Sequence, residues 1–374
     1  MIDIYIGENG AGKSRILSEI AREKISKNET TIAIATASSD RFPRRNIYNN
    51  YHYMGPRIGR DIALQSFKES FLRNGNEHIL SSIFKTLRFI KYEPILGILI
   101  KGRRQLSKTN DFIRELEYYI DSVDNHDERD ELNFLKRDLL YVIEFSGKNQ
   151  NDLTYWIDDK IFTNNNRELR ALATLFKNEA LLKKAKIIKS LDVIFVKNNT
   201  PMSISDTSSG EKSLISTTAF ISSRINSYDS KVNILIDEPE NSLHPAWQSK
   251  YISNLLDLFP YSNFDLFIAT HSPLIISGSI NEEDVNINKF NGCKFETMLD
   301  IHKGIEDALI EQFGVVTPLN NALSERCIDL INNVDQKKIT VTSAIELLSS
   351  YKDSSLDEQQ KEFLSGVIEI IESL

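Results

Sequence analysis

The chain has 374 residues, which suggests two or three domains and excludes a single small module. Hydrophobic residues make up 41% and charged residues 26%, a composition that excludes a disordered or fibrous protein. With 53 acidic and 45 basic side chains the formal net charge is -8, so uniform coating by nucleic acid is excluded as the whole role.

The first forty residues predict a strand, a glycine-rich turn, a helix and a second strand. Apolar residues dominate positions 2–6, an amphipathic stretch runs from residue 13 to about residue 27, and apolar residues return at positions 31–35. A strand, a helix and a strand in this order begin a parallel α/β sheet.

The segment from about residue 61 to residue 190 has a different pattern. Apolar residues recur there at helical spacing and turn signals are sparse, which predicts a helical insertion. Strand-like runs return at 191–196, 233–236 and 265–269, with a helical stretch between each pair. Since this is βαβ connectivity, we expect an α/β fold whose parallel-containing sheet is interrupted by the insertion.

These patterns divide the chain into a split head, a helical insertion and a helical C-terminal tail that docks a partner. The insertion is slightly basic, with clusters beginning at Lys101 and Lys183, whereas the tail is acidic. Nucleic acid is therefore a candidate contact of the insertion, although a solvated helix face explains the same charges. The expected bounds are 1–60 and 190–300 for the head, 61–189 for the insertion and 301–374 for the tail.

A phosphate loop follows the first predicted strand. Residues 7–14 match the pattern G-x-x-x-x-G-K-[ST] and open the first predicted helix. Glycines let successive N–H groups point at phosphates, Lys13 supplies a positive charge to the β and γ positions, and Ser14 supplies a hydroxyl to Mg²⁺. The residues expected to contact the nucleotide are Gly7, Glu8, Asn9, Gly10, Ala11, Gly12, Lys13, Ser14 and Arg15.

Two adjacent acids, Asp237 and Glu238, end the predicted strand 233–236, at the edge where open α/β sheets bind ligands. Neighbouring side chains on a strand point to opposite faces, so we expect different roles for them. Asp237 would hold Mg²⁺, and Glu238 would polarise the attacking water as a general base.

Two shorter motifs flank the acid pair. Ser209, Gly210 and Glu211 precede a predicted helix and offer an anion site at its N-terminus. The same motif is also typical of a helix start, where a serine caps the helix and a glutamate follows in the first turn. His271 follows the predicted strand 265–269 and could donate a hydrogen bond to a γ-phosphate oxygen.

The order of these motifs resembles an ABC-type ATPase head, a P-loop fold, and is most similar to the branch that contains the SMC, RecF and OLD-family ATPases. The run Leu243-His244-Pro245 after the acids is similar to that branch and unlike transporter subunits. Three narrower runs resemble the PtuA family of ATPase subunits from Septu-type and retron-associated anti-phage systems. They span residues 37–43, 51–55 and 305–314.

The resemblance implies an ATPase with ATP and Mg²⁺ as ligands and assigns catalytic roles to Lys13, Glu238 and His271. It implies that Ser14 and Asp237 are the Mg²⁺ ligands. In this family two heads sandwich ATP, which implies a homodimer or a higher homo-oligomer. The signature at 209–211 would then reach the nucleotide of the other subunit.

Three features depart from the family pattern. Only six residues precede Gly7, where the family has a β-hairpin that helps to hold adenine. Gln65, the nearest candidate for the Mg²⁺-sensing glutamine, lies in a helical pattern, and Thr207 and Ser209 stand where leucine and glycine are usual. These departures are compatible with slow turnover.

The expected role is that of an anti-phage ATPase that controls a separate effector nuclease of the HNH type. The six histidines are scattered without metal-ligand spacing, and the tail has no nuclease-like acid pair, so this chain is not expected to cut nucleic acid itself. The alternatives are a RecF-like DNA-repair ATPase that binds DNA directly and, less favoured, an ABC transporter subunit.

Two cysteines, Cys293 and Cys327, form neither a disulfide framework nor a zinc site. No apolar run approaches the roughly 20 residues of a membrane span, and no basic leader precedes an apolar stretch. We expect a cytoplasmic protein without a membrane segment.

Overall fold

The computed structural model describes most of the chain, and the described residues fall into two compact units. The first unit comprises residues 1–51, 233–254 and 264–374, and the second comprises 52–232 and 255–263. The described residues are 1–8, 10–43, 48–58, 62–71, 78–102, 109–144, 147–149, 152–159, 166–186, 188–225, 231–260, 262–280, 282–298, 321–354 and 358–373.

A seven-stranded sheet, most of which belongs to the first unit, carries the order β12-β11-β1-β10-β9-β2-β3. β1 runs parallel to both of its neighbours, β10 and β11, while β12 returns antiparallel to β11. The central strands β9 and β10 are almost wholly buried, as their mainly apolar sequences favour. The strands are β1 (Ile2–Ile6), β2 (Thr30–Ala35), β3 (Tyr51–Met54), β9 (Val232–Asp237), β10 (Phe264–Thr270), β11 (Val285–Phe290) and β12 (Phe295–Thr297).

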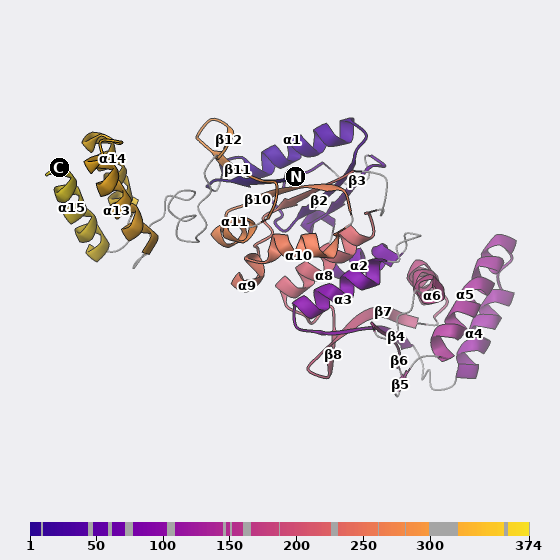
Figure 1. Ribbon diagram of the computed structural model, residues 1–374. Coiled ribbons are helices and arrows are strands. Elements are labelled where there is room, and N and C mark those ends of the chain that lie inside the picture. The colour runs from indigo at the N-terminus through magenta and orange to yellow at the C-terminus, as the bar shows by residue number, and fades with distance from the viewer. Residues whose placement is uncertain are drawn as a thin grey trace. The chain divides into compact units, whose positions relative to one another are not determined.

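Helices lie on both faces of this sheet. α1 (Lys13–Ser26) packs on β2 and β10 through Leu17 and Ala21, and α11 (Pro273–Ser279) lies on the opposite face (Figure 1). The short helix α9 (Pro245–Gln248) approaches α11, and α10 (Tyr251–Leu258) follows it.

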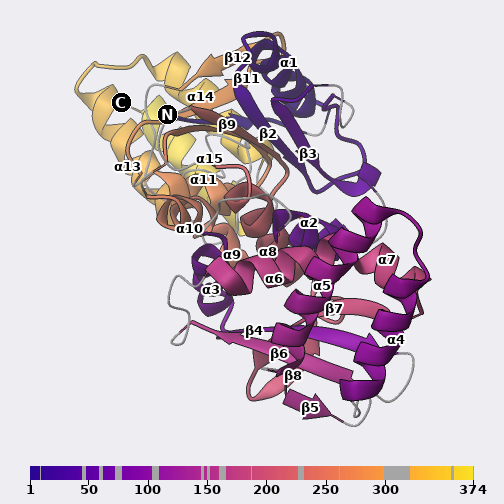
Figure 2. The same cartoon turned by 90° about the vertical axis from the view of Figure 1, so that its right-hand side faces the viewer.

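The second unit contains a five-stranded antiparallel sheet that the sequence analysis did not predict (Figure 2). Its order is β5-β6-β4-β7-β8, and β4 pairs antiparallel with both β6 and β7. The strands are β4 (Glu93–Gly102), β5 (Gly147–Asn149), β6 (Asp152–Asp158), β7 (Ile188–Lys197) and β8 (Thr200–Ser203). The helical elements are η1 (Pro56–Ile58), α2 (Ile62–Phe71), α3 (His78–Phe89), α4 (Thr109–Asp121), α5 (His126–Glu144), α6 (Asn166–Lys177), α7 (Glu179–Lys184) and α8 (Ser209–Ser222).

This sheet corrects the expectation of a purely helical insertion. The run 95–100 is apolar at nearly every position, so it has no alternation by which to distinguish a strand from a buried helix. The strand expected at 191–196 is present as part of β7, but it pairs with β4 and β8 instead of joining the parallel strands. Strand length and β-branched content were the available signals for both segments.

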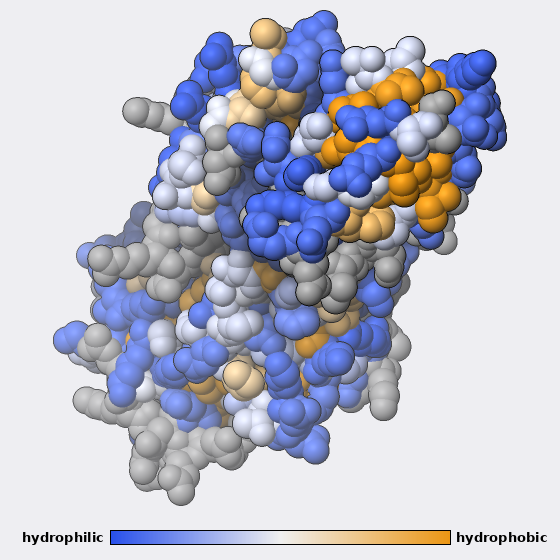
Figure 3. Space-filling model, turned by 90° about the vertical axis from the view of Figure 1, so that its left-hand side faces the viewer, coloured by the Kyte–Doolittle hydropathy of each residue, from blue (hydrophilic) through white to orange (hydrophobic). Residues whose placement is uncertain are grey.

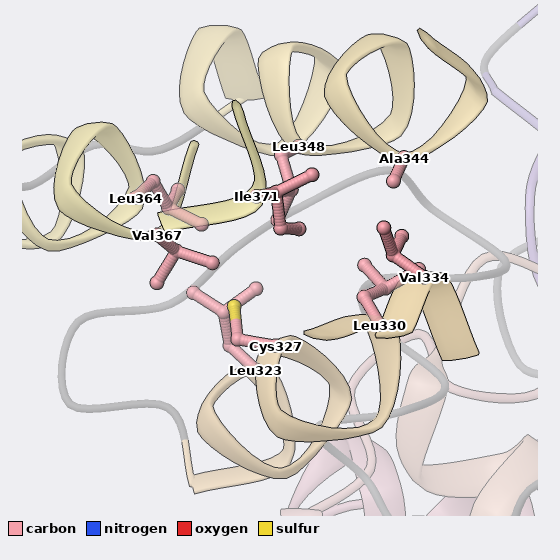
Figure 4. Packing of buried hydrophobic residues seen from close by; sticks show 9 residues of the cluster. All are labelled: Leu323, Cys327, Leu330, Val334, Ala344, Leu348, Leu364, Val367 and Ile371. Carbon is pink, nitrogen blue, oxygen red and sulfur yellow. The ribbon is translucent and has the colours of Figure 1, made fainter. Parts of the chain in front are cut away.

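The C-terminal region consists of three described helices around their own apolar core. α13 (Asn321–Asp335), α14 (Val341–Ser354) and α15 (Glu358–Glu372) bring their apolar side chains together (Figure 4). Apolar side chains also gather on the surface turned to the viewer in Figure 3. Four large apolar residues of these helices are exposed, namely Ile328, Leu347, Phe363 and Ile370. The core residues are Leu323, Cys327, Leu330, Val334, Ala344, Leu348, Leu364, Val367 and Ile371.

The α/β class, the parallel-containing sheet and the helical C-terminal region are therefore confirmed. The functional boundaries expected near residues 60, 190 and 300 stay a prediction. Among the helices that the structure describes, none combines the length and the apolar character needed to cross a membrane.

Candidate nucleotide site

The phosphate loop lies between β1 and α1, as the sequence predicts. Gly10 and Gly12 have φ angles of 88° and 93°, in the left-handed region that favours glycine. Gly12 also caps α1, so the first N–H groups of that helix open toward the loop. Arg15 points elsewhere, because its Nε donates to Glu19 Oε1 at 3.0 Å on the exposed surface of α1. Asn9 lies outside the described residues.

Lys13 is buried within the curl of this loop. Its Nζ donates to the carbonyl oxygens of Gly7 at 2.8 Å and Glu8 at 3.0 Å. Burial lowers the pKa of Lys13, and the nearby carboxylates, with Glu238 foremost, oppose that effect. The loop therefore holds a cation where the phosphate chain of a nucleotide would lie.

Asp237 ends β9 and is only 2% exposed. Burial raises the pKa of its carboxyl to about 6, and a hydrogen bond from Ser14 partly offsets that rise. The negative charges of Glu238 and Asp40 raise it further. Asp237 Oδ1 has no hydrogen-bond partner within the described part of the chain.

These features fit a magnesium ion. An unpartnered buried carboxylate oxygen beside a serine hydroxyl is a suitable ligand set, since Mg²⁺ usually takes one or two carboxylates together with substrate phosphates. Across the described residues no group of three or more His, Cys, Asp or Glu side chains could hold a metal by itself. A magnesium ion at Asp237 and Ser14 would therefore depend on phosphate oxygens for its remaining ligands.

Glu238 is held in an unusual backbone conformation, with a φ of 54°. Its N–H donates to the Ala269 oxygen at 2.8 Å, and Thr36 Oγ1 donates to the Glu238 carbonyl oxygen at 2.5 Å. Asn241 Nδ2 donates to Glu238 Oε2 at 3.0 Å. A non-glycine residue in this region costs on the order of 1–3 kcal/mol and persists where its surroundings over-determine it, often at functional sites.

His271 lies just after β10 and is paired with Glu240, a residue to which the sequence analysis gave no role. Glu240 Oε1 accepts from the His271 N–H at 2.8 Å and lies 3.1 Å from His271 Nδ1. Glu240 Oε2 is buried and has no partner among the described residues. The sequence signal was the third acid of the run Asp237-Glu238-Pro239-Glu240, but its partner is 31 positions away.

The Ser-Gly-Glu motif lies in the second unit, where Ser208 caps α8. The Glu211 N–H donates to Ser208 Oγ at 3.3 Å, and the Ser208 N–H donates to Glu211 Oε2 at 2.9 Å. Lys197 Nζ also donates to Glu211 Oε1 at 2.7 Å. Glu211 is thus buried in a capping box and an ion pair, as the capping interpretation requires. Ser209 is exposed.

The other predicted features have ordinary surroundings. Gln65 lies in α2 and donates to Glu69 Oε1 at 3.0 Å, so it contacts another side chain of its own helix. Lys101 lies 3.4 Å from Asp192, and Lys183 pairs with Glu179 at 2.6 Å. The remaining members of the first basic cluster and the run 305–314 lie outside the described residues.

A phosphate loop after β1, an acid pair after β9 and a histidine after β10 meet at one edge of a single sheet. With this arrangement the chain resembles the ABC-type P-loop ATPases. A family model described as "AAA domain, putative AbiEii toxin, Type IV TA system" matches residues 105–277, just under half of the chain. The match contains the Ser-Gly-Glu motif, the acid pair and His271, whereas the phosphate loop lies outside it.

Three relatives each align with part of the chain. The chain is 24% identical over 255 residues to "Retron Vc95 probable ATPase" of Vibrio cholerae, with 66% of this chain and 44% of that protein aligned. It is 32% identical over 129 residues to "Retron Ec83 probable ATPase" of Escherichia coli, with 32% and 23% aligned. It is 26% identical over 216 residues to "Septu protein PtuA" of Bacillus mycoides, with 54% and 30% aligned.

The aligned part spans less than half the length of each of these relatives. Among solved structures, the Smc head domain of Pyrococcus furiosus bound to the C-terminal domain of ScpA matches with a TM-score of 0.26 and 12% identity, over 63% of this chain and 57% of that one. The expected resemblance to ABC-type ATPases named for retron and Septu systems is confirmed by the sequence relatives.

Proposed function

We propose that the chain binds and hydrolyses ATP at the edge of its parallel strands. The observation that carries this proposal is the meeting of Lys13, Ser14 and Asp237, where a buried cation and an unpartnered carboxylate oxygen face one loop. A magnesium ion held there by Ser14 and Asp237 would neutralise phosphate charge. Calorimetry with Mg²⁺ and ATP tests the binding step, and Lys13→Ala is expected to abolish it.

The residues of the chain divide the hydrolysis between them. Lys13 binds the phosphate chain, and Glu238, oriented by Asn241, takes a proton from the attacking water. His271, anchored by Glu240, donates to an oxygen of the terminal phosphate. Each of these three side chains contacts a neighbouring protein group that fixes its position.

Nucleotide-dependent dimerisation of the head is the second part of the proposal. Exposed Ser209 and the free N–H groups at the start of α8 would complete the site of a second copy, since a helix N-terminus binds anions. Glu211 is held in the capping box of its own helix, so we propose that it supports this contact by fixing the start of α8. Light scattering of Glu238→Gln with and without ATP tests this step, and a monomer in both conditions would contradict it.

We also propose that the protein controls a separate effector nuclease in phage defence. Support comes from the names of the relatives and from the C-terminal helices, whose exposed apolar side chains offer a surface for a partner. Co-expression with the neighbouring gene and purification through a tag on the ATPase tests this. We expect a stable complex that is weakened by Phe363→Ser and by Ile370→Ser, both of which change exposed side chains. Ile368 packs on the core of these helices and is therefore not substituted.

A further inference from the structure

The order of strands in the sheet indicates on which side of β1 the terminal phosphate and the base of a bound nucleotide would lie. Asp237 ends β9 and His271 follows β10, and both strands lie on the same side of β1. The groups that would act on the terminal phosphate are therefore all on that side. A nucleotide with its terminal phosphate toward β9 extends its base toward the other neighbour of β1, which is β11.

An aromatic cluster lies on that other side. Phe290 ends β11 and pairs across the hairpin with Phe295, the first residue of β12, and their ring centroids are 5.3 Å apart. Tyr5 of β1 meets Phe295 edge to face at 5.4 Å. All three side chains are only partly buried, so the cluster keeps open surface at the edge of the sheet.

The cluster adjoins the phosphate loop directly. Ile6 is the partner of Lys289 in the parallel pair, which puts Phe290 alongside Gly7. A Cβ added to Gly7 would lie 3.2 Å from the Cβ of Phe290 and 3.0 Å from that of Ala11, so glycine at this position favours the close approach. The phosphate loop and Phe290 are thus neighbours within the first unit.

The chemistry of this surface suits a flat aromatic base. Aromatic side chains stack on the faces of bases with little dependence on base identity. The polar groups of the hairpin turn are used internally, since Asn291 Oδ1 accepts the N–H groups of Cys293 at 3.1 Å and Lys294 at 3.0 Å. Lys294 Nζ pairs with Glu296 at 3.1 Å. Stacking, instead of hydrogen bonds to the base edge, is therefore the interaction available.

We propose that Tyr5, Phe290 and Phe295 form the platform on which the base of a bound nucleoside triphosphate stacks. This inference rests on the proposed nucleotide binding and adds to it a base subsite built from a hairpin that follows the acid pair and the histidine in sequence. It assigns base contact to residues outside the 105–277 match.

The test compares ATP with inorganic tripolyphosphate, which has the phosphates but no base. Calorimetry with Mg²⁺ on the full chain measures both ligands for the wild type, Phe290→Leu and Phe295→Leu, which keep apolar volume and remove the ring. We expect ATP binding to weaken about tenfold or more, while tripolyphosphate binding stays within about twofold. Phe290→Tyr and Phe295→Tyr keep an aromatic ring and should bind ATP about as tightly as the wild type does.

Phe134→Leu is the matched control, because Phe134 is 60% exposed and lies in the second unit. Its ATP affinity should equal that of the wild type. Unchanged ATP binding in both platform variants, or an equal loss of both ligands, would overturn the platform. If the wild type binds neither ligand, the proposed nucleotide function itself fails, which is a distinguishable outcome.

Discussion

Glu240 and His271 are joined through a single carboxylate oxygen, which lies 2.8 Å from the His271 backbone nitrogen and 3.1 Å from its Nδ1. Glu240 is 7% exposed, whereas the His271 side chain is 42% exposed. Since the carboxylate lies beside Nδ1, a proton on Nδ1 would be directed at it and Nε2 would be left to face a ligand. We therefore propose that Glu240 positions His271 and sets its tautomer.

The first prediction concerns that tautomer. Neutral His271 should carry its proton on Nδ1, whereas His244, whose Nδ1 accepts the Ala246 N–H at 3.2 Å, should carry its proton on Nε2. Nitrogen-15 spectra of histidine-labelled protein at alkaline pH distinguish the two forms. Glu240→Gln keeps an acceptor oxygen and should keep the Nδ1–H form, whereas Glu240→Ala should lose it and lower ATP turnover about tenfold or more. Finding His271 as the Nε2–H form in the wild type would refute the assignment.

The second prediction concerns Asp237 and pH. Its folded pKa of about 6 lies above the value of about 3.9 for an exposed aspartate, so the folded state holds the proton more tightly than the unfolded state. The carboxyl therefore favours the fold below about pH 4, and this contribution is lost as the pH rises through 6. Asp237→Asn should make the ligand-free protein about 2 kcal/mol more stable at pH 7.5, with the gain shrinking toward pH 4.

Urea unfolding at several pH values measures this difference. Asp206→Asn is the control, because Asp206 is exposed and its replacement should change little. The same Asp237→Asn variant should lose Mg²⁺-dependent ATP binding. A variant that is less stable than the wild type at pH 7.5 would contradict the account of a carboxyl kept buried for a ligand.

The third prediction separates two roles of Glu211. Burial alone would raise the pKa of this carboxyl, but the Lys197 ammonium and the Ser208 N–H hold it below its usual value. The ionised form therefore stabilises the fold above about pH 4, and this stabilisation is lost as the pH falls further. Glu211→Gln should lower stability by about 1 kcal/mol at pH 7 and leave ATP affinity of the single chain unchanged. Loss of ATP-dependent dimerisation at unchanged stability would favour the contact with the other subunit's nucleotide that the sequence suggested.

The fourth prediction concerns the close packing of α11, the helix that follows His271, on the backbone of Ser249. A Cβ on Gly278, in α11, would overlap the backbone carbonyl of Ser249, and backbone cannot move aside as a flexible side chain can. Gly278→Ala should cost about 2–3 kcal/mol or prevent folding. Gly366→Ala, in α15, has open space around the added Cβ and should instead stabilise its helix by up to about 1 kcal/mol. Equal thermal shifts for the two variants would contradict the close approach.

Short sequence motifs were enough to predict the phosphate loop and the acid pair. Three glycines at positions 7, 10 and 12 before Lys13, and two acids at the end of a buried strand, carry their chemistry within a few positions. The Glu240 contact with His271 could not be predicted, since it joins loops that meet only when β9 and β10 lie side by side. The second sheet escaped prediction because the run 95–100 is apolar throughout, and periodicity then carries no information about strand or helix.

Steady-state ATP hydrolysis by the wild type, Lys13→Ala and Glu238→Gln tests the central claim most directly. Lys13→Ala removes the buried cation of the loop, and Glu238→Gln keeps the side-chain shape while removing the proposed base. We predict measurable turnover by the wild type and at least about a hundredfold lower rates for both variants, with Glu238→Gln still binding ATP. Equal rates in all three proteins would contradict the assignment of this site.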